Sequence, residues 1–181
     1  LAINALDVQA MAGLADVYRR TQRFAKAEEL LTTAIARQPG NWRAINSYGG
    51  FLFNMGRYHD ASEQFRLVLS IDPDNFSVRN NLGAALMLAT EFEEARNVFE
   101  ETLAIEPMTY QAHSNLGVIN YFLGDFDRSV ENHRRAAELT PTDALVWLNL
   151  ADSLHFAGRE EEATGAYQKA LDLSTEMLAV N

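Results

Sequence analysis

The chain contains no cysteine, and it is poor in basic residues. Without cysteine, a disulfide framework, a cysteine zinc site and a cysteine nucleophile are excluded. Lys and Arg number 15 against 25 Asp and Glu, which gives a formal net charge of −10. A nucleic-acid binder needs a concentrated basic face, and the only compact basic groups here are Arg19-Arg20 and Arg134-Arg135. We therefore expect no nucleic-acid partner.

Long apolar runs are absent as well. No run approaches the roughly 18 residues that a transmembrane helix requires, and no signal-peptide pattern is visible. We expect no membrane insertion and a cytoplasmic location. The chain is nevertheless long and rich in apolar residues. Its 181 residues, 48% of them hydrophobic, suffice for one packed core or for an elongated array of helices.

Proline is rare but regularly placed. The four prolines are Pro39, Pro73, Pro107 and Pro141, and each follows the last by 34 residues. Proline ends a helix because it lacks an N–H and restricts the residue before it. Four helix stops at one spacing indicate a single structural unit that is used repeatedly.

Several residue types recur at the same spacing. Helix N-cap types recur at Asp7, Asn41, Asn75, Thr109 and Asp143. Small residues, which let two helices approach, recur at Ala15, Gly49, Gly83, Gly117 and Ala151, and again at Ala27, Ala61, Ala95, Ser129 and Ala163. A bulky column holds Leu31, Phe65, Phe99, His133 and Tyr167. Gly56, Gly124 and Gly158 mark turns where a positive φ is often needed. Each unit therefore reads as helix, short turn, helix.

This pattern resembles the tetratricopeptide repeat. The second unit carries Tyr48-Gly49, Gly56-Arg57-Tyr58, Ala61, Phe65 and Pro73 of that motif, and the fifth carries Trp147, Leu150-Ala151, Gly158, Ala163, Tyr167 and Ala170. The resemblance covers nearly the whole chain and implies an all-α fold, a right-handed α-solenoid of helix-turn-helix repeats. The sequence pattern of the repeats is similar to that of bacterial arrays appended to Ser/Thr protein kinases, nucleotide cyclases and winged-helix regulators.

We predict a single tetratricopeptide array over residues 1–181. Its repeats span 8–41, 42–75, 76–109, 110–143 and 144–177, and the last helix is lengthened to residue 181 because Thr175 stands where the stop proline should be. Residues 1–7 are interpreted as the tail of a preceding repeat, since Leu1 and Ile3 match Leu69 and Ile71 in register. Neither end supplies an obvious polar cap. We therefore expect a piece of a longer protein, with self-association through its open ends as one outcome.

The resemblance implies a scaffold that binds a protein or peptide, not an enzyme, within a larger bacterial signalling or regulatory protein. In this family the first helix of each repeat lines a concave groove and the second mostly faces outward. The charges fit that division, because residues 110–122 hold no charged side chain whereas residues 127–138 hold six. The alternative is a structural spacer or self-association module without a peptide ligand.

Register gives a set of candidate groove residues, which are amides, aromatics and a few others. They are Arg43, Asn46, Phe53, Ser77, Asn80, Asn81, Met87, Gln111, Asn115, Tyr121, Phe122, Asn149 and Phe156. Amides would bond the backbone of an extended peptide, and aromatic and Met side chains would receive apolar anchors. Two alternatives stay open. Phe53, Tyr121 and Phe156 are also expected at packing positions, and the column of Asn81, Asn115 and Asn149 could instead cap helices locally.

Some relatives clamp the C-terminal carboxylate of heat-shock chaperones with Lys, Asn and Arg. The matching positions here carry no cation; those of the first three units are Ala12, Asp16, Ser47, Ser77 and Asn81. A buried carboxylate needs a charged partner, so we do not expect this chain to act as such a clamp.

Catalytic, cofactor and metal motifs are also missing from the sequence. There is no P-loop, no GxGxxG and no HExxH, so we expect no cofactor, no metal and no catalytic residue. His113 and His133 occupy positions used for packing within one unit, and we interpret them as packing residues that lie close enough to touch. Carboxylate pairs such as Glu28-Glu29 and Glu93-Glu94 fit a solvated outer face.

Overall fold

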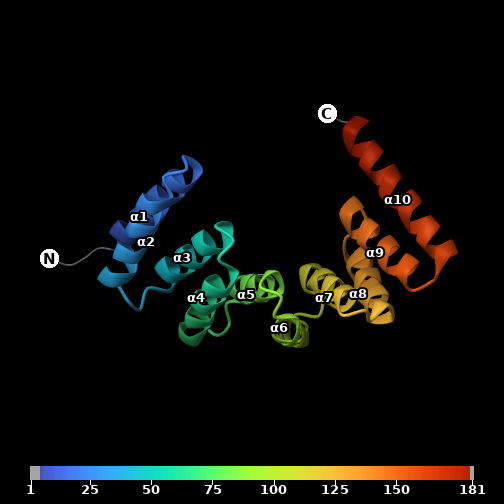
Figure 1. Cartoon of the computed structure of the whole chain (residues 1–181), viewed down its shortest axis with the longest axis horizontal. Helices are drawn as coiled ribbons and strands as arrows, with labels where there is room; N and C mark the ends of the chain where they lie inside the picture. Colours follow the sequence, from blue (N-terminus) through green and yellow to red (C-terminus); the bar gives the residue numbers. More distant parts are fainter. Residues whose placement is uncertain (1–4, 180–181) are drawn as a thin grey trace. The chain divides into compact units, whose positions relative to one another are not determined.

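The computed structural model describes the backbone of residues 5–179 and the side chains of residues 8–176. Within that part the chain forms ten α-helices and no strands (Figure 1), which confirms the predicted all-α class. The helices group into two compact units, with unit 1 ending at Glu91 and unit 2 beginning at Phe92.

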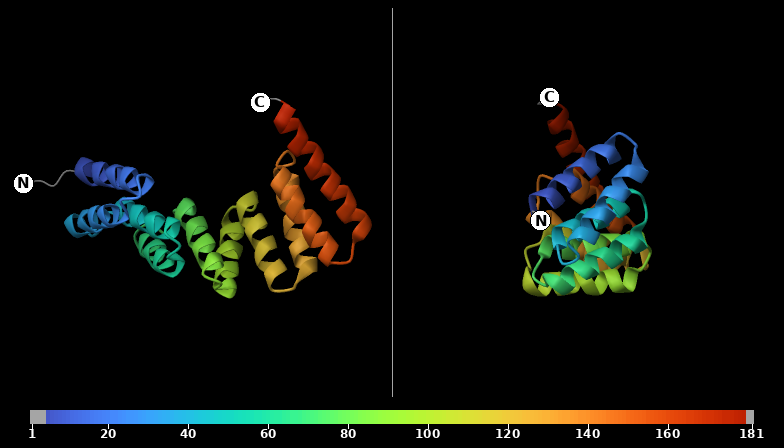
Figure 2. Two further views of the ribbon diagram at one scale, coloured as in Figure 1. Left: turned by 45° about the horizontal axis from the view of Figure 1, so that its top comes forward. Right: turned by 90° about the vertical axis from the view of Figure 1, so that its left-hand side faces the viewer.

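Unit 1 contains five helices. They are α1 (Ala5–Arg20), α2 (Phe24–Arg37), α3 (Trp42–Asn54), α4 (Tyr58–Ile71) and α5 (Phe76–Leu88). Each helix packs against the next one along the chain, and α1 also lies beside α3. Figure 2 shows α1 with α2, and α3 with α4, as successive hairpins. The first helices of the first two repeats, α1 and α3, are therefore neighbours.

Unit 2 repeats this arrangement with five more helices. They are α6 (Phe92–Ile105), α7 (Tyr110–Phe122), α8 (Phe126–Leu139), α9 (Ala144–Phe156) and α10 (Glu160–Ala179). Here too consecutive helices pack together, and α7 lies beside α9. An apolar cluster joins residues of α8, α9 and α10, including Val130, Leu150, Ala151 and Leu154.

The helix starts follow the predicted caps in three described cases. The Asn41 side chain accepts from the N–H groups of Arg43 and Ala44, and Asn75 and Asp143 accept from first-turn N–H groups in the same way. Thr109 differs, because its hydroxyl donates to the Glu106 carbonyl oxygen at 2.9 Å and caps nothing.

The turns within the hairpins use a left-handed residue. Gly56, Gly124 and Gly158 have φ of 75°, 77° and 74°, which confirms their predicted role. The equivalent turns elsewhere place Gln22 at φ 59° and Thr90 at φ 64°. Two of these turns therefore form without glycine, although a β-branched residue such as Thr90 rarely adopts this conformation.

The small and bulky columns meet between α3 and α4 and between α7 and α8. A Cβ atom added to Gly49 would lie 2.7 Å from the Phe65 ring, and one added to Gly117 would lie 2.4 Å from the His133 ring. Both ring side chains are almost fully buried. Glycine is required at these two positions because the facing ring fills the space of a side chain.

The start of α1 differs from the predicted repeat boundary. The helix begins at Ala5, so residues 5–7 belong to it and not to the tail of an earlier helix. Ala5 and Leu6 favour a helix, and no Gly or Pro separates them from the rest of α1. Residues 1–4, with Leu1 and Ile3, lie outside the described part. At the other end α10 runs to Ala179, and residues 180 and 181 are likewise outside it.

Candidate functional site

The first helices of unit 2 carry little charge. Apart from His113 and His155, α7 has no acidic or basic side chain and α9 has only Asp152. The neighbouring second helix α8 is lined with acidic and basic residues. The first-helix face of unit 2 is therefore the surface of that unit best suited to bury a partner, and each unit has a pocket between two of its first helices.

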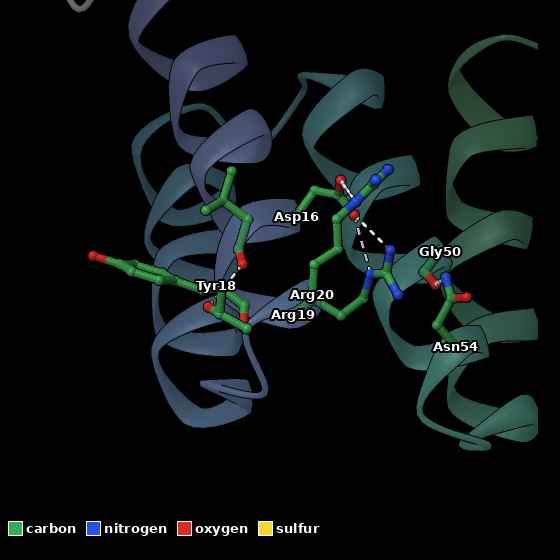
Figure 3. Close-up of polar contacts among 8 residues, drawn as sticks. Asp16, Tyr18, Arg19, Arg20, Gly50 and Asn54 are labelled. Carbon is green, nitrogen blue, oxygen red and sulfur yellow. Dashed lines mark hydrogen bonds and ion pairs between the residues drawn. The ribbon is translucent and has the colours of Figure 1, made fainter.

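The pocket of unit 1 lies between α1 and α3 and has a volume of about 240 Å³. Its lining residues are Ala12, Ala15, Asp16, Arg19, Leu31, Ser47, Gly50, Phe51 and Asn54. Figure 3 shows Arg19 and Arg20 both reaching Asp16, with a shortest N–O distance of 2.7 Å for each. Arg19, followed by Arg20, holds the pKa of the Asp16 carboxyl below its usual value. Two guanidinium groups share one carboxylate, and of these residues Asp16 and Arg19 line the pocket.

The other polar side chains of this pocket are bonded locally. Asn54 Nδ2 donates to the Gly50 carbonyl oxygen at 2.6 Å (Figure 3), and the Ser47 hydroxyl donates to the Arg43 carbonyl oxygen at 2.9 Å. Both bonds join residues one helical turn apart on α3. The Asn54 and Ser47 side chains of the pocket are therefore held in place by bonds within α3.

The pocket of unit 2 lies between α7 and α9, and its volume is about 190 Å³. Its lining residues are Val118, Tyr121, Phe122, His133, Asn149, Asp152 and Ser153. Six of them stand three repeats after a lining residue of the unit 1 pocket: Val118 after Asp16, Tyr121 after Arg19, His133 after Leu31, Asn149 after Ser47, Asp152 after Gly50 and Ser153 after Phe51. The repeat thus builds the same pocket in both units with different side chains.

Aromatic rings surround the unit 2 pocket. The Tyr121 ring makes edge contacts with Phe122 and Phe156, with ring centroids 5.7 and 5.2 Å apart. Phe126 packs on Phe156, and Phe92 stacks on Phe122. Phe122 is 65% exposed and Phe156 is 53% exposed. An exposed aromatic cluster of this kind is typical of a surface that receives a partner.

Asp152 is the one acidic residue of this pocket. The Tyr167 hydroxyl donates to Asp152 Oδ1 at 2.6 Å. This bond is the main cause that raises the pKa of Tyr167 to about 12. Among the described side chains no cation lies within ion-pair distance of Asp152, so a neutral phenol holds the carboxylate in place.

Three buried polar side chains, those of Ser129, His133 and Ser153, form a hydrogen-bonded cluster at the same pocket. Ser129 Oγ donates to the Gly117 carbonyl oxygen at 2.7 Å, and Ser153 Oγ lies 2.7 Å from Ser129 Oγ and 2.8 Å from His133 Nδ1. All three side chains are almost fully buried. Burial lowers the pKa of His133 to about 4. The ring is therefore neutral at pH 7 and serves packing within its repeat, as predicted.

The second histidine of that prediction lies elsewhere. His113 Nε2 is 3.1 Å from the Pro107 carbonyl oxygen, and no hydrogen bond joins the two histidine rings. Residues 8–176 contain no group of three or more His, Asp or Glu side chains placed to hold a metal ion. Within the described part, the helices are also too short or too polar to cross a lipid bilayer.

The predicted groove residues divide between the units. In unit 1 the exposed ones are Arg43, Ser77 and Asn81, and the half-buried ones are Asn46, Phe53, Asn80 and Met87. In unit 2 the exposed ones are Gln111, Phe122 and Phe156, and the half-buried ones are Asn115, Tyr121 and Asn149. The structure brings Tyr121, Phe122 and Asn149 into one pocket, with Phe156 against Tyr121. Gln111, at the start of α7, lines none of the pockets described here.

These positions bear on two alternatives, helix capping by the Asn column and a packing role for the aromatic residues. Asn81, Asn115 and Asn149 lie in the middle of α5, α7 and α9 and make no capping bond, so the capping interpretation is wrong. Phe53 makes an edge contact with Tyr58, with ring centroids 5.4 Å apart, and is partly used in packing.

Other residues of the pockets were not among the predicted set. Asp16 and Asp152 belong to a column of first-helix positions that reads Asp16, Gly50, Ala84, Val118 and Asp152. Their signal in the sequence was a charged residue within an otherwise small or apolar column. Arg19 and Arg20 stand in groove-facing columns by register, and in the structure Arg19 lines the unit 1 pocket while Arg20 pairs with Asp16 beside it.

The chain matches two family profiles. A profile described as tetratricopeptide repeat matches residues 12–76 and 121–176, and a second profile with the same description matches residues 52–116. A search of curated proteins found no match.

Solved structures with the same fold include several of MamA. A structure titled "MamA 41-end from Desulfovibrio magneticus RS-1" has a TM-score of 0.85 at 19% identity and covers 97% of this chain and 98% of its own. One titled "Crystal structure of MamA protein" has a TM-score of 0.82 at 18% identity, with 96% and 94% covered. These likenesses show an all-α helical-repeat fold. Together with the profile matches, which span more than half of the sequence, they establish that the chain belongs to the tetratricopeptide repeat family.

Proposed function

We propose that this chain is a scaffold that binds peptide segments of a protein partner on the first-helix face of each unit. Tetratricopeptide repeats are protein-interaction modules. The observation that carries the proposal is the recurrence of one pocket, at the same repeat positions, between α1 and α3 and between α7 and α9. A pocket that recurs with different linings suits recognition of successive side chains along a peptide.

The surroundings of the pockets support this use. On the first-helix face of unit 2, Asp152 is the acidic residue that needs compensation, and the rest of α7 and α9 can be covered at little desolvation cost. The half-buried amides Asn115 and Asn149 lie on these helices and can bond a peptide backbone. We further propose that the partner belongs to a bacterial signalling or regulatory system in the cytoplasm. This proposal is based on the sequence pattern of the repeats alone.

Removing both exposed rings of unit 2 tests the proposal. Phe122→Ala with Phe156→Ala should weaken binding of peptides selected from a displayed random library by about 10- to 100-fold, because exposed aromatic anchors dominate such surfaces. The melting temperature should change little, since both rings are more than half exposed. Ile105→Ala, which removes an exposed apolar side chain from the second helix α6, is the matched control. Equal affinity for the double variant and the wild type would refute a groove at these rings.

Self-association is a second candidate function, favoured by apolar surface at both ends of the repeat series. On α1, Leu14 and Val17 are 44% and 52% exposed, although most residues in their register are buried in later repeats. On α10, Tyr167 and Leu171 are 38% and 58% exposed and line a groove of about 980 Å³ with Leu145 and Leu148. The α1 surface of one copy could cover the α10 surface of another, as consecutive repeats cover each other within a unit.

Paired charge substitutions test this contact. Val17→Glu blocks the α1 surface and Leu171→Glu blocks the α10 surface, so each variant alone should have the 20.2 kDa mass of one chain in light scattering. A head-to-tail contact predicts that a mixture of the two variants forms a species of twice that mass and nothing larger, because each supplies the surface that the other lacks. The wild type should form longer assemblies as concentration rises. A wild type that stays at the mass of one chain throughout the series would exclude this contact.

A further inference from the structure

The unit 2 pocket combines two features that a general peptide groove does not require. Aromatic rings line one side, and a carboxylate without a cationic partner lies among them. A purely apolar anchor from a ligand would remove water from Asp152 and leave its charge uncompensated, which is costly. A ligand with a positively charged group would compensate the charge of Asp152.

The groups around Asp152 do not supply that positive charge. Tyr167 donates a neutral hydrogen bond, and His133 is neutral at pH 7 because burial lowers its pKa to about 4. His155 lies 3.1 Å from Glu160, so its charge, when present, is matched by that carboxylate. With a formal net charge of −10, the chain as a whole also attracts basic partners.

The rings offer the second half of a cation site. Tyr121 stands nearly perpendicular to both Phe122 and Phe156, with interplanar angles of 88° and 89°. The two phenylalanines are more than half exposed, so ring surface is open to a ligand. A guanidinium or ammonium group over an aromatic face is attracted by the ring electrons. Its aliphatic stem would cover the same apolar surface.

We propose that this pocket, formed by Tyr121, Phe122, Asn149 and Asp152, receives one arginine or lysine side chain of a bound peptide. The inference rests on the proposed function and specifies its ligand. The cation lies against the rings and pairs with the free oxygen of Asp152, while the Asn149 amide bonds the peptide. The volume of about 190 Å³ admits a single long side chain. The unit 1 pocket cannot act in this way, because Gly50 stands at the register of Asp152 and Arg20 at that of Phe122.

A displayed library of random 12-residue peptides, panned on the wild type and on Asp152→Asn, tests the proposal. Asparagine keeps the acceptor for the Tyr167 hydroxyl, so the pocket stays folded while its charge is lost. We expect a fixed Arg or Lys among peptides that bind the wild type, and no such enrichment on Asp152→Asn. In titrations, replacing that Arg with citrulline should weaken binding to the wild type by about 10- to 100-fold and weaken binding to Asp152→Asn much less, because only the attraction between the cation and the rings is then lost. Asp127→Asn, on the outer helix α8, makes the same change in net charge and should bind as the wild type does.

Each contrary result has a distinct meaning. Enriched peptides with an apolar or acidic residue at the fixed position, bound equally by the wild type and Asp152→Asn, would overturn the cation site and leave the peptide-binding scaffold standing. An equal loss of affinity in Asp127→Asn would show a general charge effect and would also overturn the site. If no peptide is enriched on the wild type, the proposed function itself fails, and the cation site fails with it.

Discussion

Replacing Gly117 with alanine should lower the free energy of unfolding of unit 2 by about 3 kcal/mol. On an exposed helix the same change would stabilise the protein by about 1 kcal/mol, because alanine is the better helix former. At this position the new Cβ would lie 2.4 Å from the His133 ring. The ring is held by Ser153, so the backbone of α7 or the ring itself must be displaced.

Chemical denaturation can measure this loss. Trp42 lies in unit 1 and Trp147 in unit 2, so a Trp42→Phe background lets the remaining tryptophan report on unit 2. Gly165→Ala is the matched control, because nothing lies within 4 Å of a Cβ atom added at that helical glycine. It should raise stability by about 1 kcal/mol.

A double-mutant cycle separates the steric contact from other causes. His133→Ala removes the ring and is destabilising by itself, since it leaves a cavity. Adding Gly117→Ala to that variant should cost nothing further, because the space is then free. Independent, additive losses from the two substitutions would show that the glycine and the ring do not compete for space.

Unit 2 should also lose stability in mild acid because of His133. The folded pKa of about 4 lies below the unfolded value of 6.5, so the unfolded chain binds a proton that the folded chain excludes. Stability is complete above pH 6.5 and falls as the pH drops from 6.5 to about 4. The loss over this window is about 3 kcal/mol, which follows from the size of the shift.

A triple variant isolates this contribution from that of the carboxylates. Ser129→Ala, His133→Phe and Ser153→Ala introduce residues that earlier repeats already carry in the same register, namely Ala95, Phe99 and Ala85. All three of these residues are fully buried. The measurement is the change of the denaturation midpoint with pH, in the wild type and in the triple variant. Between pH 6.5 and pH 4 the midpoint of the wild type should fall more steeply than that of the triple variant. Equal slopes of midpoint against pH in this range would exclude His133 as the cause.

The repeat period was sufficient to predict the helices, because each stop, cap and small residue obeys a local rule. Asn41, Asn75 and Asp143 cap as their types suggest, and Gly56, Gly124 and Gly158 adopt positive φ. The rules failed where other residues took over the same geometry. Gln22 and Thr90 form left-handed turns that their side chains do not favour.

The candidate site was predictable in outline but not in its chemistry. Register placed Tyr121, Phe122 and Asn149 on first helices, and they do line one pocket. The pairing of Asp16 with Arg19 and Arg20, and that of Asp152 with Tyr167, depends on side-chain conformation and on contacts between helices. Periodicity identifies a face of a helix, but it does not show which side chains meet across two helices.

Photo-crosslinking tests the central claim, that partners bind the first-helix faces, most directly. A library-selected peptide that carries a benzophenone side chain can be crosslinked to the wild type, and mass spectrometry then identifies the modified residues. We expect modification on α1, α3, α5, α7 or α9, at pocket residues such as Asn54, Tyr121 or Phe122. Crosslinks confined to the outward faces of second helices, for example at Glu131 on α8, would contradict it.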